Sequence, residues 1–223
     1  MYDAVIFDND GVLLELTGMP PHYEGAREAF AAVGVDDPAD EDVEAMSLGV
    51  TVPDLQRVCE RYDLDPETFW RARDRELARI QQAEMRAGRK EPYDDIDALS
   101  ALDLPLGVVS SNQDATVTFA FEYFDIDRYF ETVYGRPPTV ESLRRKKPEP
   151  YYLQQALSDL DARDALYVGD SETDIQAAHA AGIDAAFLRR PHRADAVLSS
   201  TPDYEVTGLD EIVELLTGGS ASD

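Results

Sequence analysis

Cysteine, lysine and long apolar runs are the features that this sequence has least of. Cys59 is the only cysteine, so no disulfide can form within the chain. No run of about eighteen or more apolar residues occurs, which argues against a transmembrane helix. The first residues, MYDAVIF, carry neither a basic region nor a long apolar region, so they do not resemble a secretory leader. From these absences we expect a cytoplasmic protein that does not bind membranes.

Basic residues are scarce as well. The chain has 46 acidic residues against 20 basic ones, for a formal net charge of −26, and its only lysines are Lys90, Lys146 and Lys147. Without a basic stripe to neutralise phosphates, nucleic acid is not expected as a partner. The charge fits an ordinary acidic protein or, as we favour, a halophilic one. At 1 M salt the screening length falls to about 3 Å, which removes most repulsion among surface carboxylates.

Short apolar segments alternate with helical patterns over most of the chain. Strands of the kind buried on both faces are expected at residues 4–7, 106–109, 165–168 and 184–188. The segments between them repeat apolar residues at helical spacing, and Gly182 is placed to end one of these helices. This alternation predicts an α/β fold with a parallel, doubly wound sheet.

The alternation stops between residues 16 and 92, where helical patterns occur without a clear strand. We expect three helices there, the second beginning near Pro53 and the third near Pro66. The prediction is therefore a Rossmann-like core of residues 1–15 and 93–223, with an all-helical cap inserted after its first strand.

Carboxylates follow two of the predicted strands at their carboxyl ends. Asp8 and Asp10 come after the first strand, and Asp170 and Asp174 come after the third. Ligands bind at this edge of open α/β sheets. Carboxylates this close repel unless a cation lies between them, and a hard divalent ion such as Mg²⁺ suits oxygen ligands. The alternatives are a solvated acidic turn for the first pair and helix capping for the second.

Hydroxyl, amide and ammonium groups are expected at the same edge. Ser110, Ser111 and Asn112 follow the second strand, where a hydroxyl and free backbone amides can hold a phosphoryl oxygen or cap the next helix. Lys146 and Lys147 stand in tandem before a proline. A lysine there could neutralise charge on a transferring group, or could pair with surface acids in a basic loop.

Together these groups resemble the four motifs of the haloacid dehalogenase superfamily of phosphotransferases, over nearly the whole chain. The matching residues are, in motif order, Asp8-Asn9-Asp10-Gly11, Ser110, Lys147 with Pro148, and Gly169-Asp170 with Asp174. The predicted helical cap is similar to that of the phosphoglycolate phosphatase-like branch.

The resemblance implies a Mg²⁺-dependent phosphatase that hydrolyses a small phosphorylated metabolite, phosphoglycolate-like or a sugar phosphate, through an aspartyl phosphate. Asp8 would be the nucleophile, Asp10 the general acid and base, and Lys147 a catalytic partner for the phosphoryl oxygens. Dehalogenases of the superfamily lack an acid at the position of Asp10, so a phosphoryl substrate is favoured over a haloacid. The implied phosphate ligands are Ser110, Ser111 and Asn112, and the implied metal ligands are Asp8, Asp10 through its backbone carbonyl, Asp170, and Asp174 as a ligand or beside one.

Some features depart from the family pattern. Ser111 duplicates Ser110, so either hydroxyl could contact phosphate. The segment 135–145 looks longer than usual, and we expect a mobile loop beside the site. Lys146 could substitute in part for Lys147.

Two other functions remain open. A phosphosugar mutase similar to β-phosphoglucomutase would need cap residues that hold a bisphosphate intermediate and exclude water, and the sequence identifies none. A non-catalytic binding protein would not need Asp8 and Lys147 intact. If the cap sets specificity, then changes at Arg27 or His22 are expected to alter relative rates among substrates, although for His22 a capping or surface role is favoured over contact with substrate.

Overall fold

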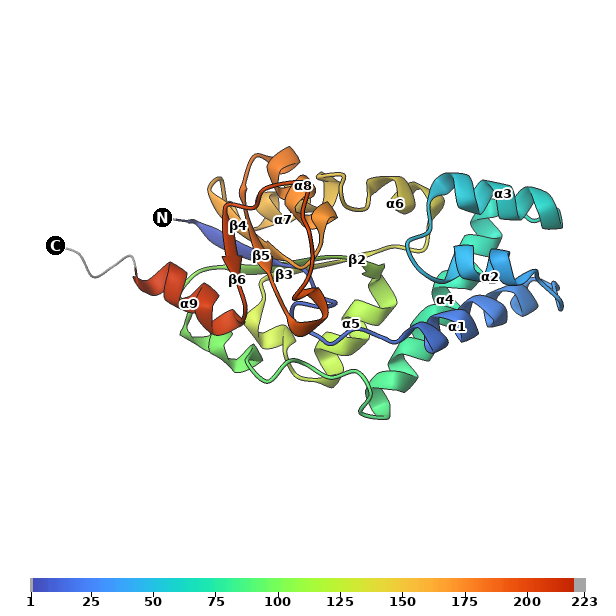
Figure 1. Cartoon of the computed structure of the whole chain (residues 1–223), viewed down its shortest axis with the longest axis horizontal. Coiled ribbons are helices and arrows are strands. Elements are labelled where there is room, and N and C mark those ends of the chain that lie inside the picture. Colours follow the sequence, from blue (N-terminus) through green and yellow to red (C-terminus); the bar gives the residue numbers. More distant parts are fainter. Residues whose placement is uncertain (1, 219–223) are drawn as a thin grey trace.

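The computed structural model describes residues 2–218, which fold around one six-stranded sheet (Figure 1). In sequence order the strands are β1 (Ala4–Phe7), β2 (Leu106–Gln113), β3 (Thr132–Arg136), β4 (Ala165–Gly169), β5 (Asp184–Leu188) and β6 (Tyr204–Val206). Neighbouring strands run parallel in every pair, in the spatial order β3-β2-β1-β4-β5-β6. The predicted α/β fold with a parallel, doubly wound sheet is confirmed.

Three strands differ from the prediction. β3 and β6 form the two edges of the sheet and are only partly buried, so neither carries the continuous apolar run of a strand covered on both faces. β2 continues to Gln113, beyond its predicted end at Val109, and its register against β3 shifts between these two residues. Ser110, Ser111 and Asn112 therefore belong to a strand and not to a loop.

Helices cover both faces of the sheet (Figure 1). On one face lie α5 (Asp114–Tyr123), α9 (Leu209–Thr217) and the 3₁₀ helices η1 (Ile96–Ala101) and η2 (Asp127–Tyr129), and on the other lie α7 (Tyr151–Asp159) and α8 (Glu172–Ala181). In β1, Val5 and Phe7 belong to the first of these two apolar layers, whereas Ala4 and Ile6 belong to the second. All four side chains are buried, as the unbroken apolar run of this inner strand requires.

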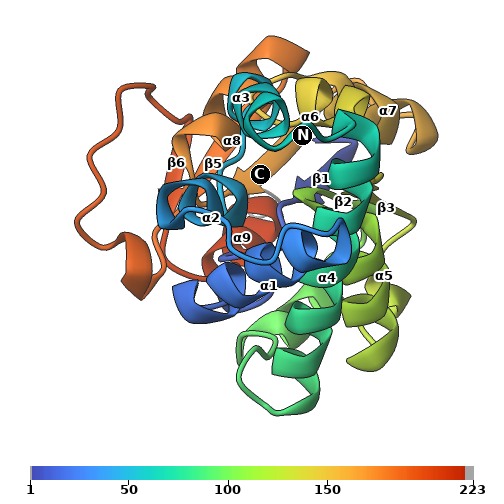
Figure 2. The same ribbon diagram turned by 90° about the vertical axis from the view of Figure 1, so that its right-hand side faces the viewer.

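Four helices follow β1 and lie beyond the carboxyl ends of the strands; in Figure 2 they stand in front of the sheet. They are α1 (Met19–Ala32), α2 (Asp40–Ser47), α3 (Val52–Tyr62) and α4 (Pro66–Arg86). The sequence did not indicate α2, because Val43 and Met46 are its main apolar residues and acidic residues fill its first turn. The division into a cap of residues 16–92 and a two-part core stays a prediction. Within residues 2–218, no helix has both the length and the apolar character needed to cross a bilayer.

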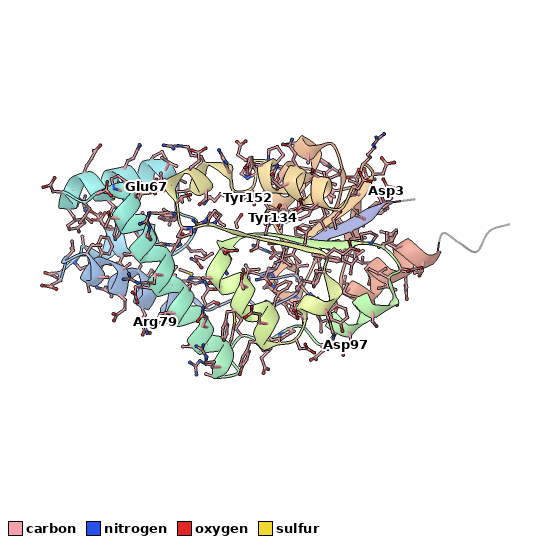
Figure 3. All side chains as sticks on the ribbon, turned by 180° about the vertical axis from the view of Figure 1, so that it is seen from behind. Asp3, Glu67, Arg79, Asp97, Tyr134 and Tyr152 are labelled. Carbon is pink, nitrogen blue, oxygen red and sulfur yellow. The ribbon has the colours of Figure 1, made fainter. Side chains whose placement is uncertain are left out.

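The segment expected to be a mobile loop contains a helix, α6 (Val140–Arg145). Val140 and Leu143 are buried in the same apolar cluster as residues of α1 and α4. The backbone N–H of Val140 also donates to the carboxylate of Glu67 at 3.3 Å, near the start of α4 (Figure 3). The segment 135–145 is therefore not a simple loop, its mobility stays a prediction, and α6 connects the sheet to the four helices. Nearby, the rings of Tyr134 and Tyr152 pack β3 against α7 with centroids 6.2 Å apart (Figure 3).

The net charge of −26 predicts that folding depends on salt. Repulsion among carboxylates destabilises the compact state in dilute buffer and is screened at molar salt. Between low salt and 1 M KCl we expect the Tm to rise by more than about 10 °C, which for a chain of this size is roughly 3 kcal/mol or more. Differential scanning calorimetry in KCl, with sucrose as an uncharged control, measures this shift. A flat profile in KCl would leave only the interpretation as an ordinary acidic protein.

Candidate active site

Three neighbouring strands deliver the predicted site residues to one edge of the sheet. Asp8 follows β1, Ser110 lies in the last part of β2, and Asp170 follows β4. Because β1 lies between β2 and β4, residues more than a hundred positions apart meet there. A cavity of about 690 Å³ opens between this edge and helices α1 and α4. The predicted residues that line it are Asp8, Asp10, Ser110, Ser111, Asn112 and Lys146.

Asp8 is buried and held by Lys147. The Lys147 ammonium lies 2.8 Å from Oδ1 of Asp8 and 2.6 Å from Oδ1 of Asp174, and it donates to the Tyr167 hydroxyl at 2.7 Å. Burial and the repulsion from Asp174 and Asp170 raise the pKa of Asp8 to about 8, because the attraction of Lys147 does not offset them. Burial disfavours the Lys147 ammonium, but Asp174 and Asp8 outweigh it and raise the pKa of Lys147. Lys147 is therefore a cation in direct contact with Asp8.

Asp8, Asp170 and Asp174 form a compact, buried acidic cluster. Each offers a carboxylate oxygen, and the three atoms lie within 4.8 Å of one another. The lack of a side chain at Gly11 leaves room for the Asp170 carboxylate, since a Cβ at position 11 would lie 2.5 Å from Oδ2 of Asp170. Three oxygen donors at this spacing suit a hard divalent cation. Burial makes the repulsion among the three carboxylates costly, and a bound cation would relieve it. The residues present therefore fit Mg²⁺.

Two members of this cluster also have protein partners. The carboxylate of Asp174 accepts from the backbone N–H of Ser171 at 2.9 Å and so caps α8, the structural role that the sequence left open for it. Asp170 accepts from Nε2 of His192 at 2.7 Å and from Nε of Arg193 at 3.0 Å. Both donors lie in the 3₁₀ helix η3 (Pro191–Arg193), and the sequence gave no sign of either contact.

The carboxylate of Asp10 has partners outside the acidic cluster. Its Oδ1 pairs with the ammonium of Lys90, and its Oδ2 accepts from the Asn112 amide at 2.8 Å. Lys90 is completely buried and also donates to Oε1 of Gln81 at 3.1 Å. Burial alone would raise the pKa of Asp10, but Lys90 and Asn112 outweigh burial and lower it. In this arrangement Asp10 is a carboxylate, ready to accept a proton.

The two serines of β2 differ in burial. Ser110 is 3% exposed, and its hydroxyl accepts from the backbone N–H of Asn112 at 3.1 Å, whereas Ser111 is half-buried. Both line the cavity, so the choice between them as phosphate ligand stays open. The Asn112 side chain bonds to Asp10, and its role as a phosphate ligand remains a prediction.

Of the two cap residues proposed to set specificity, the structure places only one on the cavity. His22 lines it and is buried, so a surface role is wrong, and the N-cap of α1 is Gly18, so a capping role is wrong as well. Burial and the nearby cations Arg73 and Lys90 lower the pKa of His22 to about 4, so it is neutral at physiological pH. Arg27 is exposed, pairs with a surface carboxylate and does not line the cavity.

Comparison with known proteins identifies the family of this chain. The family model for haloacid dehalogenase-like hydrolases matches residues 5–188. The chain belongs to this family. Phosphoglycolate phosphatases of Escherichia coli K12 and Salmonella choleraesuis are 32% and 33% identical to it over 126 residues, which is 55% of this hydrolase. That match spans 48% of their length, about half of each relative.

Solved structures share the fold of the hydrolase over nearly its whole length. CbbY from Rhodobacter sphaeroides, solved with phosphate, superposes with a TM-score of 0.69 at 21% identity, covering 95% of this chain and 96% of its own. A predicted phosphoglycolate phosphatase from Haemophilus somnus gives 0.65 at 21% identity, covering 96% and 97%. A β-phosphoglucomutase assigned in Thermotoga maritima gives 0.60 at 20% identity, covering 97% and 99%. At this identity the likeness establishes the fold.

Lys90 and Gln81, like His192 and Arg193, are residues of the hydrolase site that the sequence did not indicate. Lys90 pairs with Asp10 across 80 positions, and Gln81 accepts from Lys90 and Asn112, so no local pattern links these residues. The scarcity of lysine was the available signal. Lys90, Lys146 and Lys147 are the only lysines of the chain, and all three contact or line this site. Lys146 donates to the Val50 carbonyl at 2.6 Å, so it does not duplicate Lys147 in holding Asp8.

Replacement of Lys90 by Met is expected to destabilise the hydrolase by about 3 kcal/mol, at the lower end of the range for breaking a buried ion pair, because the side chain of Asp10 is 22% exposed. Arg89→Met is the matched control. Its exposed pair with Glu84 should contribute about 1 kcal/mol or less. Urea unfolding measures both values. Equal losses at positions 89 and 90 would show that Lys90 is not needed to balance the charge of Asp10.

Proposed function

We propose that this hydrolase is a phosphatase that cleaves a small phosphorylated metabolite, through a phosphoryl group carried on Asp8. One observation carries the proposal. Asp8 lines the cavity and lies beside Lys147 and two carboxylates. A second acid, Asp10, follows two residues later and lines the same cavity. The named phosphoglycolate phosphatases that match half of the chain support the same activity.

In the first half-reaction, a carboxylate oxygen of Asp8 attacks phosphorus and the bond from phosphorus to the ester oxygen breaks. The leaving oxygen takes a proton from Asp10. Asp10 must be protonated for this step, although Lys90 favours its charged form. The negative charge of a phosphoryl group beside Asp10 raises the pKa of its carboxyl. Substrate binding thus supplies the condition for proton donation. Lys147 and a serine hydroxyl of β2 balance the charge on the phosphoryl oxygens.

In the second half-reaction, water attacks phosphorus and the bond to Asp8 breaks. Asp10, now a carboxylate, takes the proton of that water, and its pair with Lys90 favours the basic form needed for this step. The sum is one ester and one water converted to one alcohol and one phosphate. Each carboxylate returns to its starting state.

Mg²⁺ is the proposed cofactor, with Asp8 and Asp170 as ligands and Asp174 as a ligand or beside one. The backbone carbonyl of Asp10 is the fourth protein group proposed. When bound, the cation would neutralise charge on the phosphoryl oxygens. It would also favour the ionised form of Asp8, which burial disfavours.

A panel of phosphorylated metabolites, assayed with Mg²⁺ at molar KCl, tests the proposed activity. Inorganic phosphate should be released from at least one small phosphate monoester and from a generic aryl phosphate. The phosphosugar mutase remains the alternative, because a protein of that description shares the fold. A mutase would instead move phosphate within a sugar phosphate without releasing it. Absence of both reactions would favour a binding protein.

A further inference from the structure

A group of cations, two of them buried and one half-buried, lies on the cap side of the cavity. It consists of Arg73 on α4, Arg136 at the end of β3 and Lys146 after α6, and all three line the cavity. The carboxylate among them is Asp74. It is chelated by the Arg136 guanidinium through two bonds of 2.7 Å and bonded to Arg73 at 3.0 Å. We call these four residues the basic cluster. Three cations against one carboxylate leave it a net positive charge, in a chain whose total is −26.

Lys146 carries the uncompensated part of this charge. Its ammonium donates to the backbone carbonyl of Val50, and among residues 2–218 no carboxylate oxygen lies within 4.0 Å of it. Burial, Arg136 and Arg73 lower the pKa of Lys146 to about 8. Lys146 is half-buried, and partial burial of an ammonium without a counter-ion is unfavourable. Among residues 2–218, no side-chain contact explains why a lysine stands beside two arginines at this position.

Two buried polar atoms without a hydrogen-bond partner belong to residues that line the same cavity. The indole N–H of Trp70, a residue only 1% exposed, has no acceptor, and Nδ1 of His22 is also buried without a partner. Both residues line the cavity. The guanidiniums of Arg73 and Arg136 lie 4.8 and 4.6 Å from the centre of the Trp70 ring. An anion that entered here could give the Trp70 N–H the acceptor that it lacks.

We propose that the basic cluster binds a second anionic group of the substrate, while Asp8 attacks the phosphoryl group. The substrate class is then a phosphate monoester whose remaining part bears a carboxylate or another phosphate. This inference rests on the proposed phosphatase function and narrows it. An anion at Lys146 would supply the missing counter-charge, and a substrate with a neutral hydroxylated tail would leave the half-buried ammonium without one.

Matched substrate pairs and a Lys146→Met variant test this inference. 3-Phosphoglycerate and glycerol 3-phosphate differ by a carboxylate, and fructose 1,6-bisphosphate and fructose 6-phosphate differ by a second phosphate. In the unchanged enzyme, kcat/KM should favour the anionic member of at least one pair by about tenfold or more, the contribution of one charge-assisted hydrogen bond. Lys146→Met should remove most of that preference, chiefly through KM. The pair that responds identifies the second group as carboxylate or phosphate.

Two controls separate recognition from folding and from chemistry. Arg27→Met removes one exposed cation and should keep the substrate preference. Calorimetric binding of the same pairs to an Asp8→Asn variant repeats the comparison without turnover, so a protein that hydrolyses nothing still tests the cluster. The inference is overturned if neither pair shows a preference in the unchanged enzyme, or if Lys146→Met weakens both members equally. Failure to release phosphate from any substrate, with the binding preference intact, would count against the phosphatase alone.

Discussion

Asp8→Asn is expected to lower phosphate release by roughly four orders of magnitude or more with every substrate, as loss of an attacking residue does in other covalent enzymes. Asn is similar in size and can still accept from Lys147, so the fold and the cavity should survive. The measurement is kcat by release of inorganic phosphate, on protein whose Tm is checked first. Substantial turnover by this variant would mean that water or another residue attacks phosphorus.

Asp10→Asn is the matched comparison for Asp8→Asn, and it should impair a different step of the reaction. It keeps the nucleophile and removes only the group that moves protons. Esters with poor leaving groups should lose most of their rate, whereas acetyl phosphate, whose leaving group needs little protonation, should still transfer its phosphoryl group. Identical losses for both kinds of substrate would indicate that Asp10 is required for structure and not for proton transfer.

Removal of divalent cations is the second large effect expected. With excess chelator, activity should fall to below about 1%, because the chemistry assigned to the cation has no substitute among the side chains of the site. Added Mg²⁺ should restore it, and Ca²⁺ should restore it poorly, since its looser and larger coordination spoils the in-line geometry. This prediction rests on the buried cluster of Asp8, Asp170 and Asp174.

A second readout separates binding of the cation from catalysis. Mg²⁺ should raise the Tm, because a ligand that binds only the folded state stabilises it by mass action. Asp170→Asn should reduce this shift, while Asp97→Asn, an exposed carboxylate away from the cluster, should preserve it. Full activity in excess chelator would contradict the metal assignment. An unchanged Tm shift in the Asp170 variant would place the cation elsewhere.

The edge of the sheet was predictable because local pattern and topology both point to it. Inner parallel strands carry unbroken apolar runs, so the polar residues that end them, Asp8 and Asp170, stand out in the sequence. The rule that ligands bind at the carboxyl ends then brings them together without knowledge of any contact. The buried acidic cluster follows from these two facts and from Asp174 on the first turn of α8.

The cap side of the cavity was not predictable, because tertiary packing creates it. Lys90 reaches Asp10 across 80 positions, and Arg136 reaches Asp74 across 62. Neither pair has a sequence spacing that a helix or strand would impose. α6 was missed for a related reason, since Val140 and Leu143 are too few to show helical periodicity and become buried only against α1 and α4.

The central claim is that Asp8 carries the phosphoryl group, and the mass of the intact protein tests it most directly. After incubation with acetyl phosphate and Mg²⁺, the Asp10→Asn variant should gain about 80 Da, the mass of one phosphoryl group, because the intermediate forms and no base activates water to remove it. Peptide mapping should place this mass on Asp8, and the Asp8→Asn variant should gain none. An adduct on the Asp8→Asn protein, or a mapped site at any other residue, would contradict the claim.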